Sequence, residues 1–396
     1  MNRPSLSCVV QKLQPSGIRR FFDLVSQMED VIALGVGEPD FSTPWGIASA
    51  AVGALELGRT SYTSNYGLLD LRIEIALHLQ RRYGVPYDPE REILVTVGVS
   101  EALDLAARAI LNPGDEVLLP QPCYVSYEPV VRLAGGVPIP VPTTLEEGFQ
   151  PDPERLAAAV TPRTKAILIG SPCNPTGVVV ERERLLALGE LAQRHNLLII
   201  SDEIYDQLCY GVEHTCVASL PGLRERTILL NGFSKAYAMT GWRIGYAAAP
   251  AWILEAMLKI HQYTMLCAPI MAQIAAKEAL RNGEKYVREM VQAYDRRRRF
   301  LVNRFQELGL EFVEPQGAFY IFPSIRSSGL SSEEFSQRLL LEKRVAVVPG
   351  NAFGACGEGF VRITYASSIE ALAEAVQRLE EFLLEHRFGK AERALA

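Results

Sequence analysis

The stretch EILVTVGVSEALDLAARAILNPGDEVLLP, residues 92–120, sets the pattern of the fold. An apolar run rich in β-branched residues gives way to an amphipathic run and then to a second apolar run, which indicates a strand, a helix and a strand. Similar apolar runs recur further along the chain as VPIPVP (137–142), KAILIG (165–170), LLIISDE (197–203), TILLNG (227–232) and RIGYAAAP (243–250). Strands that alternate with helices predict an α/β unit whose mainly parallel sheet is covered by helices on both faces.

The pattern changes after about residue 285. A long amphipathic stretch comes first, and it is followed by EFVEPQGAFYIFP (311–323), a helical stretch (331–343), VAVVPG (345–350), FVRITYA (360–366) and a last helix from Ser368 to about His386. Fewer, hairpin-like strands predict a smaller α+β unit. We therefore expect an N-terminal segment (1–45) that packs with the small unit, a large domain (46–285) and a small C-terminal domain (286–396).

The composition is that of an ordinary globular protein. Its formal charge of -6 gives no overall attraction for nucleic acid or an anionic membrane, and we interpret the run Arg296–Arg299 as a solvated helix face. The N-terminus lacks the apolar core of a signal peptide, and no apolar run reaches the length of a membrane span. The seven cysteines form no Cys-x-x-Cys pair and the five histidines show no metal-ligand spacing. We expect a cytoplasmic protein with reduced thiols and no metal.

The loop GFSKAYAMTGWRIG (232–245) carries the most specific chemistry. Lys235 comes just past a buried strand, with Ser234 beside it and Arg243 eight residues on. A hydroxyl and a guanidinium suit a phosphate dianion, and a lysine desolvated at that place can form an imine with an aldehyde. A surface lysine in an ordinary loop would not account for this combination.

A second stretch, LLIISDEIY (197–205), places Asp202 at the end of a buried apolar strand. A buried carboxylate needs a cationic partner, and a protonated pyridine nitrogen would be one. Tyr205, three residues on, is expected to point its hydroxyl at a phenolic oxygen of the same ring. The alternative for Asp202 is a salt bridge or a helix cap.

Two more loops follow predicted strands. In SPCNPTG (171–177), two prolines and a glycine fix a turn that would hold the amide of Asn174 in one orientation. GVSEAL (98–103) starts a helix, whose free N–H groups suit a phosphate. Either stretch alone is compatible with a plain structural turn. Ligands of open α/β sheets lie outside the carboxyl ends of the strands, where all of these loops are expected.

These four loops, in this order, resemble the class I aminotransferases of pyridoxal 5'-phosphate (PLP) fold type I, subgroup I-gamma, nearest to the aromatic-amino-acid and aspartate aminotransferases of bacteria and archaea. Further matching motifs run along nearly the whole chain: GEPDFSTP (37–44), SYTSNYG (61–67), VVPGNAF (347–353) and FVRITYA (360–366). The resemblance implies a PLP cofactor, a large domain with a mainly parallel sheet between helices, and a smaller α+β domain. It also implies a transaminase of amino-acid metabolism that acts on an amino acid and a 2-oxo acid.

The resemblance also assigns roles to matching residues. It makes Lys235 the Schiff-base lysine and proton shuttle, Asp202 the partner of the ring nitrogen, and Tyr205 and Asn174 the donors to the phenolic oxygen. Tyr124 would stack on the cofactor ring. The implied phosphate contacts are Ser100, the backbone of Glu101, Ser234 and Arg243. The implied substrate contacts are Gly37, Asn174 and Arg362. The last of these also follows from the residues, since an arginine in an apolar strand needs an anion, although a structural ion pair would serve as well.

Tyr62 matches a tyrosine that in this family reaches the phosphate of the neighbouring subunit, so the resemblance implies a homodimer with shared active sites. Cys173 departs from the family pattern, and we interpret it as a packed thiol.

The implied reaction is ping-pong, with Lys235 as general acid and base in both directions. The cofactor residues alone do not exclude another PLP reaction on this fold, such as C–S β-elimination from a sulfur amino acid or ring closure of an S-adenosyl substrate. A PLP-fold module of a transcription regulator is disfavoured, because no DNA-binding segment precedes the enzyme-like start. A nicotinamide enzyme is disfavoured, because GVGEPD (35–40) lacks a third glycine.

The substrate rests on weaker signals. Aspartate-preferring relatives carry a lysine where this chain has Glu101, and a carboxylate at the pocket mouth would repel a second carboxylate. SGIRRFF (16–22) resembles the N-terminal flap of aromatic-amino-acid aminotransferases. We therefore favour a neutral, aromatic amino donor with 2-oxoglutarate as acceptor. If Glu101 instead contributes only its backbone, Arg19 or Arg20 could serve an acidic substrate, and aspartate or an N-acyl-diaminopimelate returns as a candidate.

Overall fold

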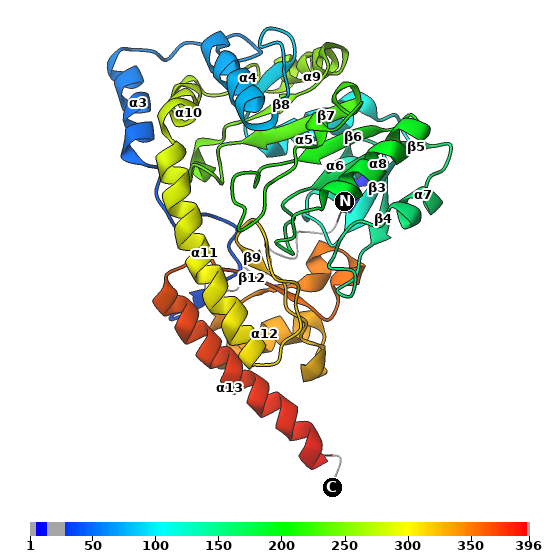
Figure 1. Cartoon of the computed structure of the whole chain (residues 1–396), viewed down its shortest axis with the longest axis vertical. Coiled ribbons are helices and arrows are strands. Elements are labelled where there is room, and N and C mark those ends of the chain that lie inside the picture. Colours follow the sequence, from blue (N-terminus) through cyan, green and yellow to red (C-terminus); the bar gives the residue numbers. More distant parts are fainter. Residues whose placement is uncertain (1–4, 14–27, 394–396) are drawn as a thin grey trace.

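The computed structural model describes residues 5–13 and 28–393. Its largest element is a seven-stranded sheet (Figure 1) with the strand order β2-β8-β7-β6-β5-β3-β4. The strands are β2 (Ile93–Thr96), β3 (Glu116–Gln121), β4 (Val137–Pro142), β5 (Thr164–Gly170), β6 (Leu198–Asp202), β7 (Thr227–Gly232) and β8 (Gly245–Ala248). β8 runs antiparallel to both of its neighbours, and every other pairing in the sheet is parallel. The predicted mainly parallel sheet is confirmed.

Helices cover both faces of this sheet because successive apolar residues of each strand point to opposite sides. On one face, Leu118 and Ile167 pack with residues of α7 (Pro153–Ala158) and α8 (Arg182–Arg194). On the other face, Val117 and Leu119 pack with residues of α5 (Val99–Ile110), α6 (Tyr127–Leu133) and α9 (Ala251–Thr264). A third cluster joins β2 and β8 to α3 (Trp45–Glu56), α4 (Leu69–Tyr83) and α10 (Ile270–Asn282).

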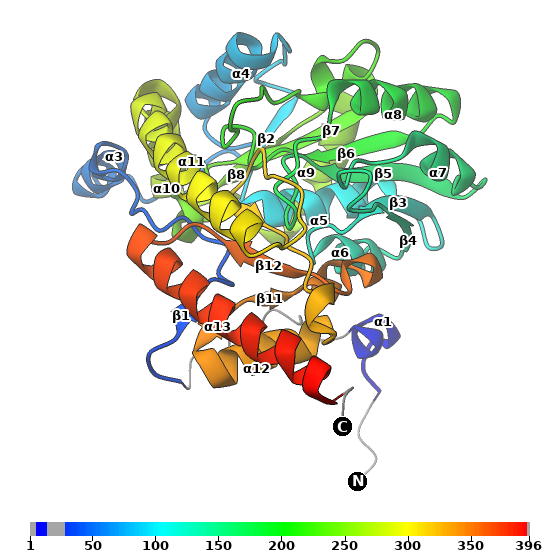
Figure 2. The same cartoon turned by 60° about the horizontal axis from the view of Figure 1, so that its bottom comes forward.

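The remaining elements form a second, smaller assembly. A three-stranded antiparallel sheet has the order β11-β12-β9, with β9 (Tyr320–Ile321), β11 (Val348–Pro349) and β12 (Val361–Thr364). It lies between the large sheet and the helices α12 (Ser332–Lys343) and α13 (Ile369–Arg393), as Figure 2 shows. The long helix α11 (Glu284–Glu307) runs from the side of α10 down to this assembly. The last helix, α13, ends at Arg393 and so extends past the end that was predicted near His386.

The N-terminal part of the chain contacts both assemblies. β1 (Ile32–Ala33) pairs in parallel with β10 (Val345–Ala346), whereas α1 (Cys8–Lys12) contacts α6. The domain boundaries at residues 45 and 285 stay predictions. Within the described ranges, no helix is long and apolar enough to cross a membrane.

Candidate active site

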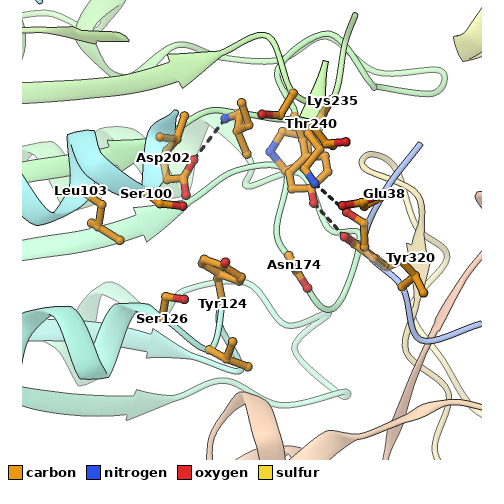
Figure 3. Close-up of a pocket in the computed structure, with 18 of the residues that line it drawn as sticks. Glu38, Ser100, Leu103, Tyr124, Ser126, Asn174, Asp202, Lys235, Thr240 and Tyr320 are labelled. Carbon is orange, nitrogen blue, oxygen red and sulfur yellow. Dashed lines mark hydrogen bonds between the residues drawn. The ribbon is translucent and has the colours of Figure 1, made fainter. Parts of the chain in front are cut away.

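The loops after β2, β5, β6 and β7 meet around a cavity of about 740 Å³. Parallel strands bring their carboxyl ends to one edge of a sheet, so residues far apart in the sequence converge there. Figure 3 shows Asn174, Lys235 and Tyr320 approaching the cavity from different elements. The sequence-predicted residues that line it are Gly37, Ser100, Tyr124, Asn174, Asp202, Tyr205, Ser234, Lys235, Arg243 and Arg362.

Lys235 lies shortly after β7, past Phe233 and Ser234, and its Nζ donates a hydrogen bond of 2.6 Å to the carbonyl oxygen of Gly37. Burial lowers the pKa of Lys235 to about 8, although the nearby Glu38 carboxylate opposes this shift. An amine that loses its proton near neutral pH is a better nucleophile and proton carrier than an exposed lysine. The site therefore offers an amine suited to imine formation.

Asp202 is the last residue of β6 and is almost completely buried. Burial raises the pKa of its carboxyl to about 6. The Tyr127 hydroxyl acts against this shift by donating a hydrogen bond of 2.9 Å to Oδ2, and the amide of Ile204 donates one of 3.2 Å to Oδ1. Sequence reasoning missed Tyr127, whose only signal was a second tyrosine three residues after Tyr124.

The hydroxyls of Tyr205 and Tyr320 share a hydrogen bond of 2.8 Å, and both side chains are buried. Burial raises the pKa of each tyrosine, so both keep their protons at neutral pH. Tyr320 also explains Gly37, because a Cβ added to Gly37 would lie 2.6 Å from the Tyr320 hydroxyl oxygen. Tyr320 lies in the segment 311–323, but no local feature of the sequence singles it out from the other aromatic residues there.

Arg362, in the middle of the short strand β12, is 2% exposed. Its guanidinium donates to Oδ1 of Asn174 (2.8 Å) and to the carbonyl of Gly35 (2.6 Å), and it lies 4.4 Å from the centre of the Tyr320 ring. Burial lowers its pKa. Nε has no partner, and no carboxylate in the described part of the chain forms an ion pair with Arg362. An uncompensated buried cation favours an anionic ligand over a structural ion pair.

The opposite end of the cavity gathers groups that suit a phosphate. Gly98 has φ +79° and leads into α5, and Ser100 lies in the first turn of that helix. The positive φ favours glycine at this position, and a Cβ there would lie 2.7 Å from a guanidinium nitrogen of Arg243 and would displace that side chain. The same guanidinium donates to the carbonyl of Thr240 at 2.9 Å. A hydroxyl, free helix N–H groups and a guanidinium are the groups that suit an anion.

Two predicted residues do not line the cavity. The Glu101 carboxylate points away from it, and accepts hydrogen bonds from the Val97 amide (2.5 Å) and from Nδ1 of His261 (2.6 Å). The reading in which Glu101 repels a dicarboxylate from the pocket mouth is therefore wrong, because its charge is directed into the protein. Tyr62 is 83% exposed on the surface of the single chain. The predicted flap (16–22), with Arg19 and Arg20, lies outside the described residues.

Cys173, the departure from the family pattern, lies next to Asn174. Its Sγ is 3.6 Å from the carbonyl oxygen of Pro122, and burial raises the pKa of the thiol. These contacts describe a protonated thiol packed behind the site.

Comparison with known proteins gives consistent matches along the chain. A family model described as aminotransferase class I and II matches residues 29–379. A putative aminotransferase, YugH, of Bacillus subtilis is 54% identical over 96% of this chain and 98% of its own length. An aspartate aminotransferase of Pyrococcus abyssi is 49% identical over 95% of this chain and 97% of its own length. The solved structure of an aromatic aminotransferase from Pyrococcus horikoshii superposes with a TM-score of 0.88 at 48% identity, and covers 92% of this chain and 99% of its own.

Proposed function

Because the chain belongs to the class I and II aminotransferases, which are PLP enzymes, we propose that it moves the amino group of a neutral, preferably aromatic, L-amino acid to 2-oxoglutarate by a ping-pong route. The chain is thus a PLP-dependent transaminase. The proposal concerns the substrates, the order of the two half-reactions and the roles of individual residues.

The residues around the cavity fit PLP at three separate points. The guanidinium of Arg243 and the start of α5 would hold the phosphate, together with Ser100 and Ser234. The buried Asp202 carboxylate would pair with the ring nitrogen, and Tyr124 would lie against the ring face. Tyr205 and Asn174 would donate to the phenolic oxygen.

When bound, PLP supplies an aldehyde that joins to amines and a protonated ring that withdraws electrons from the substrate. The Nζ of Lys235 would carry a proton to and from the α-carbon of the substrate, a role for which its pKa of about 8 is suited. Arg362 would hold the α-carboxylate through two N–H groups of its guanidinium, with Asn174 alongside. Gly37 would bring its backbone close to the same carboxylate.

The substrate preference is carried by one observation about charge. The cationic side chains that line the described part of the cavity are Lys235, Arg243 and Arg362, and each already has a role. No described cation is left for the side-chain carboxylate of an acidic donor, and the second carboxylate of the acceptor 2-oxoglutarate would have to be met by a cation outside the described residues, such as Arg19 or Arg20. The aliphatic side chains of the lining include Val36, Val99, Leu103, Val125 and Ile204, and they favour a neutral side chain. A relative from Thermococcus litoralis that is 45% identical is named aromatic-amino-acid aminotransferase 2.

An acidic donor is the second candidate. Relatives named aspartate aminotransferase and probable N-acetyl-LL-diaminopimelate aminotransferase are 49% and 44% identical to this chain. With the Glu101 carboxylate turned away from the cavity, nothing described there repels a second carboxylate apart from Glu38 and Asp202. In this case Arg19 or Arg20 would supply the missing cation.

The test is a half-reaction screen. Amino acids are added one at a time to the cofactor-loaded enzyme without a 2-oxo acid, and the rate of change of the cofactor absorbance is recorded. Phenylalanine and tyrosine are expected to react faster than aspartate. Aspartate reacting at least tenfold faster than both would contradict the proposal. In that event the variants Arg19→Gln and Arg20→Gln show which arginine pairs with the second carboxylate. Replacing that arginine should slow the half-reaction of aspartate and leave that of phenylalanine unchanged.

We also propose a homodimer with shared active sites. Tyr62 is a large side chain that is 83% exposed in the single chain, as a residue of a subunit interface would be. A two-fold interface would bring the Tyr62 of each subunit to the site of the other.

A further inference from the structure

The turn Val97–Ser100, which leads from β2 into α5, is held from beneath by the side chain of Glu101. We propose that Glu101, anchored by His261, is a positioning residue that keeps this turn in the shape that binds the cofactor phosphate. The inference rests on the proposed placement of the phosphate against Ser100 and Arg243. It assigns a function to a side chain that faces away from the cavity.

The contacts of Glu101 tie two distant segments together. Its Oε2 accepts the Val97 amide at 2.5 Å, and its Oε1 accepts Nδ1 of His261, on α9, at 2.6 Å. The His261 side chain is 0% exposed and that of Glu101 is 8% exposed. An ionised carboxylate only accepts hydrogen bonds, so Nδ1 of His261 carries the proton of this contact. Such a buried, charge-assisted bond fixes the Glu101 side chain in one position.

The turn has little freedom in the other directions. The Thr96 hydroxyl donates to the carbonyl of Gly98 at 3.0 Å. A Cβ on Gly98 would meet Arg243, and one on Gly245 would lie 2.8 Å from the Val99 amide nitrogen. The turn therefore lies directly against the guanidinium that is proposed to hold the phosphate. A shift of the turn moves one side of the anion site relative to the other.

The inward bond of Val97 also decides which amides remain for the ligand. The first N–H groups of a helix have no acceptor within the helix. Val99 and Ser100, the first two residues of α5, both line the cavity. With Val97 bonded to Glu101, the donors that face the cavity are those at the start of α5, which is where a phosphate is bound best.

Charge and geometry predict opposite effects of Glu101. A carboxylate behind an anion site repels the anion, so a purely electrostatic role means that Glu101→Gln strengthens phosphate binding. A positioning role means that Glu101→Gln is nearly neutral, because its amide oxygen still accepts the Val97 amide and its NH₂ donates to Nδ1 of His261 once the imidazole carries its proton on Nε2, which has no partner in the parent. Glu101→Ala removes both contacts and releases the turn.

The experiment compares two ligands of the full-length chain stripped of cofactor: PLP, and pyridoxal, which lacks the phosphate. The measured quantity is the ratio of the pyridoxal Kd to the PLP Kd, obtained by absorbance or fluorescence titration without substrate. Loss of one charge-assisted hydrogen bond corresponds to about a tenfold change, so Glu101→Ala is expected to lower the ratio about tenfold. His261→Phe, which fills the buried space, is expected to lower the ratio by a smaller factor.

Three further variants make the result decisive. Glu101→Gln should keep the ratio within about threefold of the parent, and Asp104→Ala, which removes another carboxylate of α5, should leave it unchanged. An unchanged ratio in both Glu101→Ala and His261→Phe overturns the inference, and so does a higher ratio in Glu101→Gln. If Glu101→Ala does not fold, His261→Phe and Glu101→Gln decide alone. Arg243→Leu tests the premise that the phosphate binds against Arg243. If the ratio of the two Kd values is unchanged in this variant, the phosphate does not bind there.

Discussion

Replacing Arg362 by leucine should weaken the reaction of amino acids far more than that of amines that lack a carboxylate. Arg362 is 2% exposed, its Nε has no partner, and no described carboxylate neutralises its guanidinium. The guanidinium donates one hydrogen bond to Asn174 and one to the carbonyl of Gly35, and its remaining N–H groups are free to bind a substrate carboxylate.

The size of the effect follows from these contacts. A bidentate pairing adds two charge-assisted hydrogen bonds in a water-poor site, and breaking such a buried pair costs about 3 kcal/mol or more. Since 1.4 kcal/mol is a factor of about ten, kcat/KM for tyrosine should fall at least about a hundredfold in Arg362→Leu. Arg362→Lys keeps the charge but loses the bidentate geometry, so its kcat/KM for tyrosine should lie between those of the parent and of Arg362→Leu.

The assay compares tyrosine with tyramine, which has the same side chain and amine but no carboxylate. Tyramine is a poor substrate of the parent enzyme on this account, and Arg362→Leu should change its half-reaction rate by less than about threefold. An equal loss for the two compounds would mean that the variant damages the site in general, and would refute the assignment of Arg362 to the α-carboxylate.

Three further predictions concern titration and assembly. Cofactor uptake by the stripped chain should speed up as pH rises through about 8 and then level off, because Lys235 is the nucleophile only without its proton; a stopped-flow profile that climbs until about 10.5 would count against the burial of this amine. Cofactor affinity should fall as pH drops through about 6, where Asp202 gains a proton. Tyr127→Phe should move this fall to higher pH, because it removes a hydrogen bond that favours the carboxylate. An unchanged pH profile would mean that Tyr127 does not influence the pKa of Asp202. Mixing Lys235→Ala subunits with Tyr62→Phe subunits should restore activity, because one of the two sites in the mixed dimer then has both residues intact; no recovery after exchange, or full activity of a monomer, would argue against shared sites.

Much of the fold and site could be predicted from local sequence. The alternation of apolar and amphipathic runs indicated the parallel sheet, because a strand followed by a helix is the repeating unit of such sheets. Lys235 and Asp202 could be selected because each lies at the carboxyl end of a buried strand, and this position is visible in the sequence. The positions of these two residues could be identified because they depend only on where the nearest strand ends.

The contacts between distant residues could not be predicted in this way. His261 is 160 residues from Glu101 in the sequence, and nothing local indicated that the carboxylate would turn inward to it. Tyr127 meets Asp202 across 75 residues, and Tyr320 meets Tyr205 across 115. Such pairs are set by how α6, α9 and β9 pack around the sheet. The direction of a side chain at the start of a helix depends on these partners and not on the helix itself.

The central claim is that this chain holds PLP through Lys235 and exchanges amino groups there. Borohydride reduction of the cofactor-loaded enzyme, followed by proteolysis and mass spectrometry, tests it most directly. The account predicts one phosphopyridoxyl group per chain, attached to the peptide that contains Lys235, and a strong decrease in labelling when an amino acid is added before the reductant. A label on another lysine, or a label on Lys235 that no amino acid diminishes, would contradict the account.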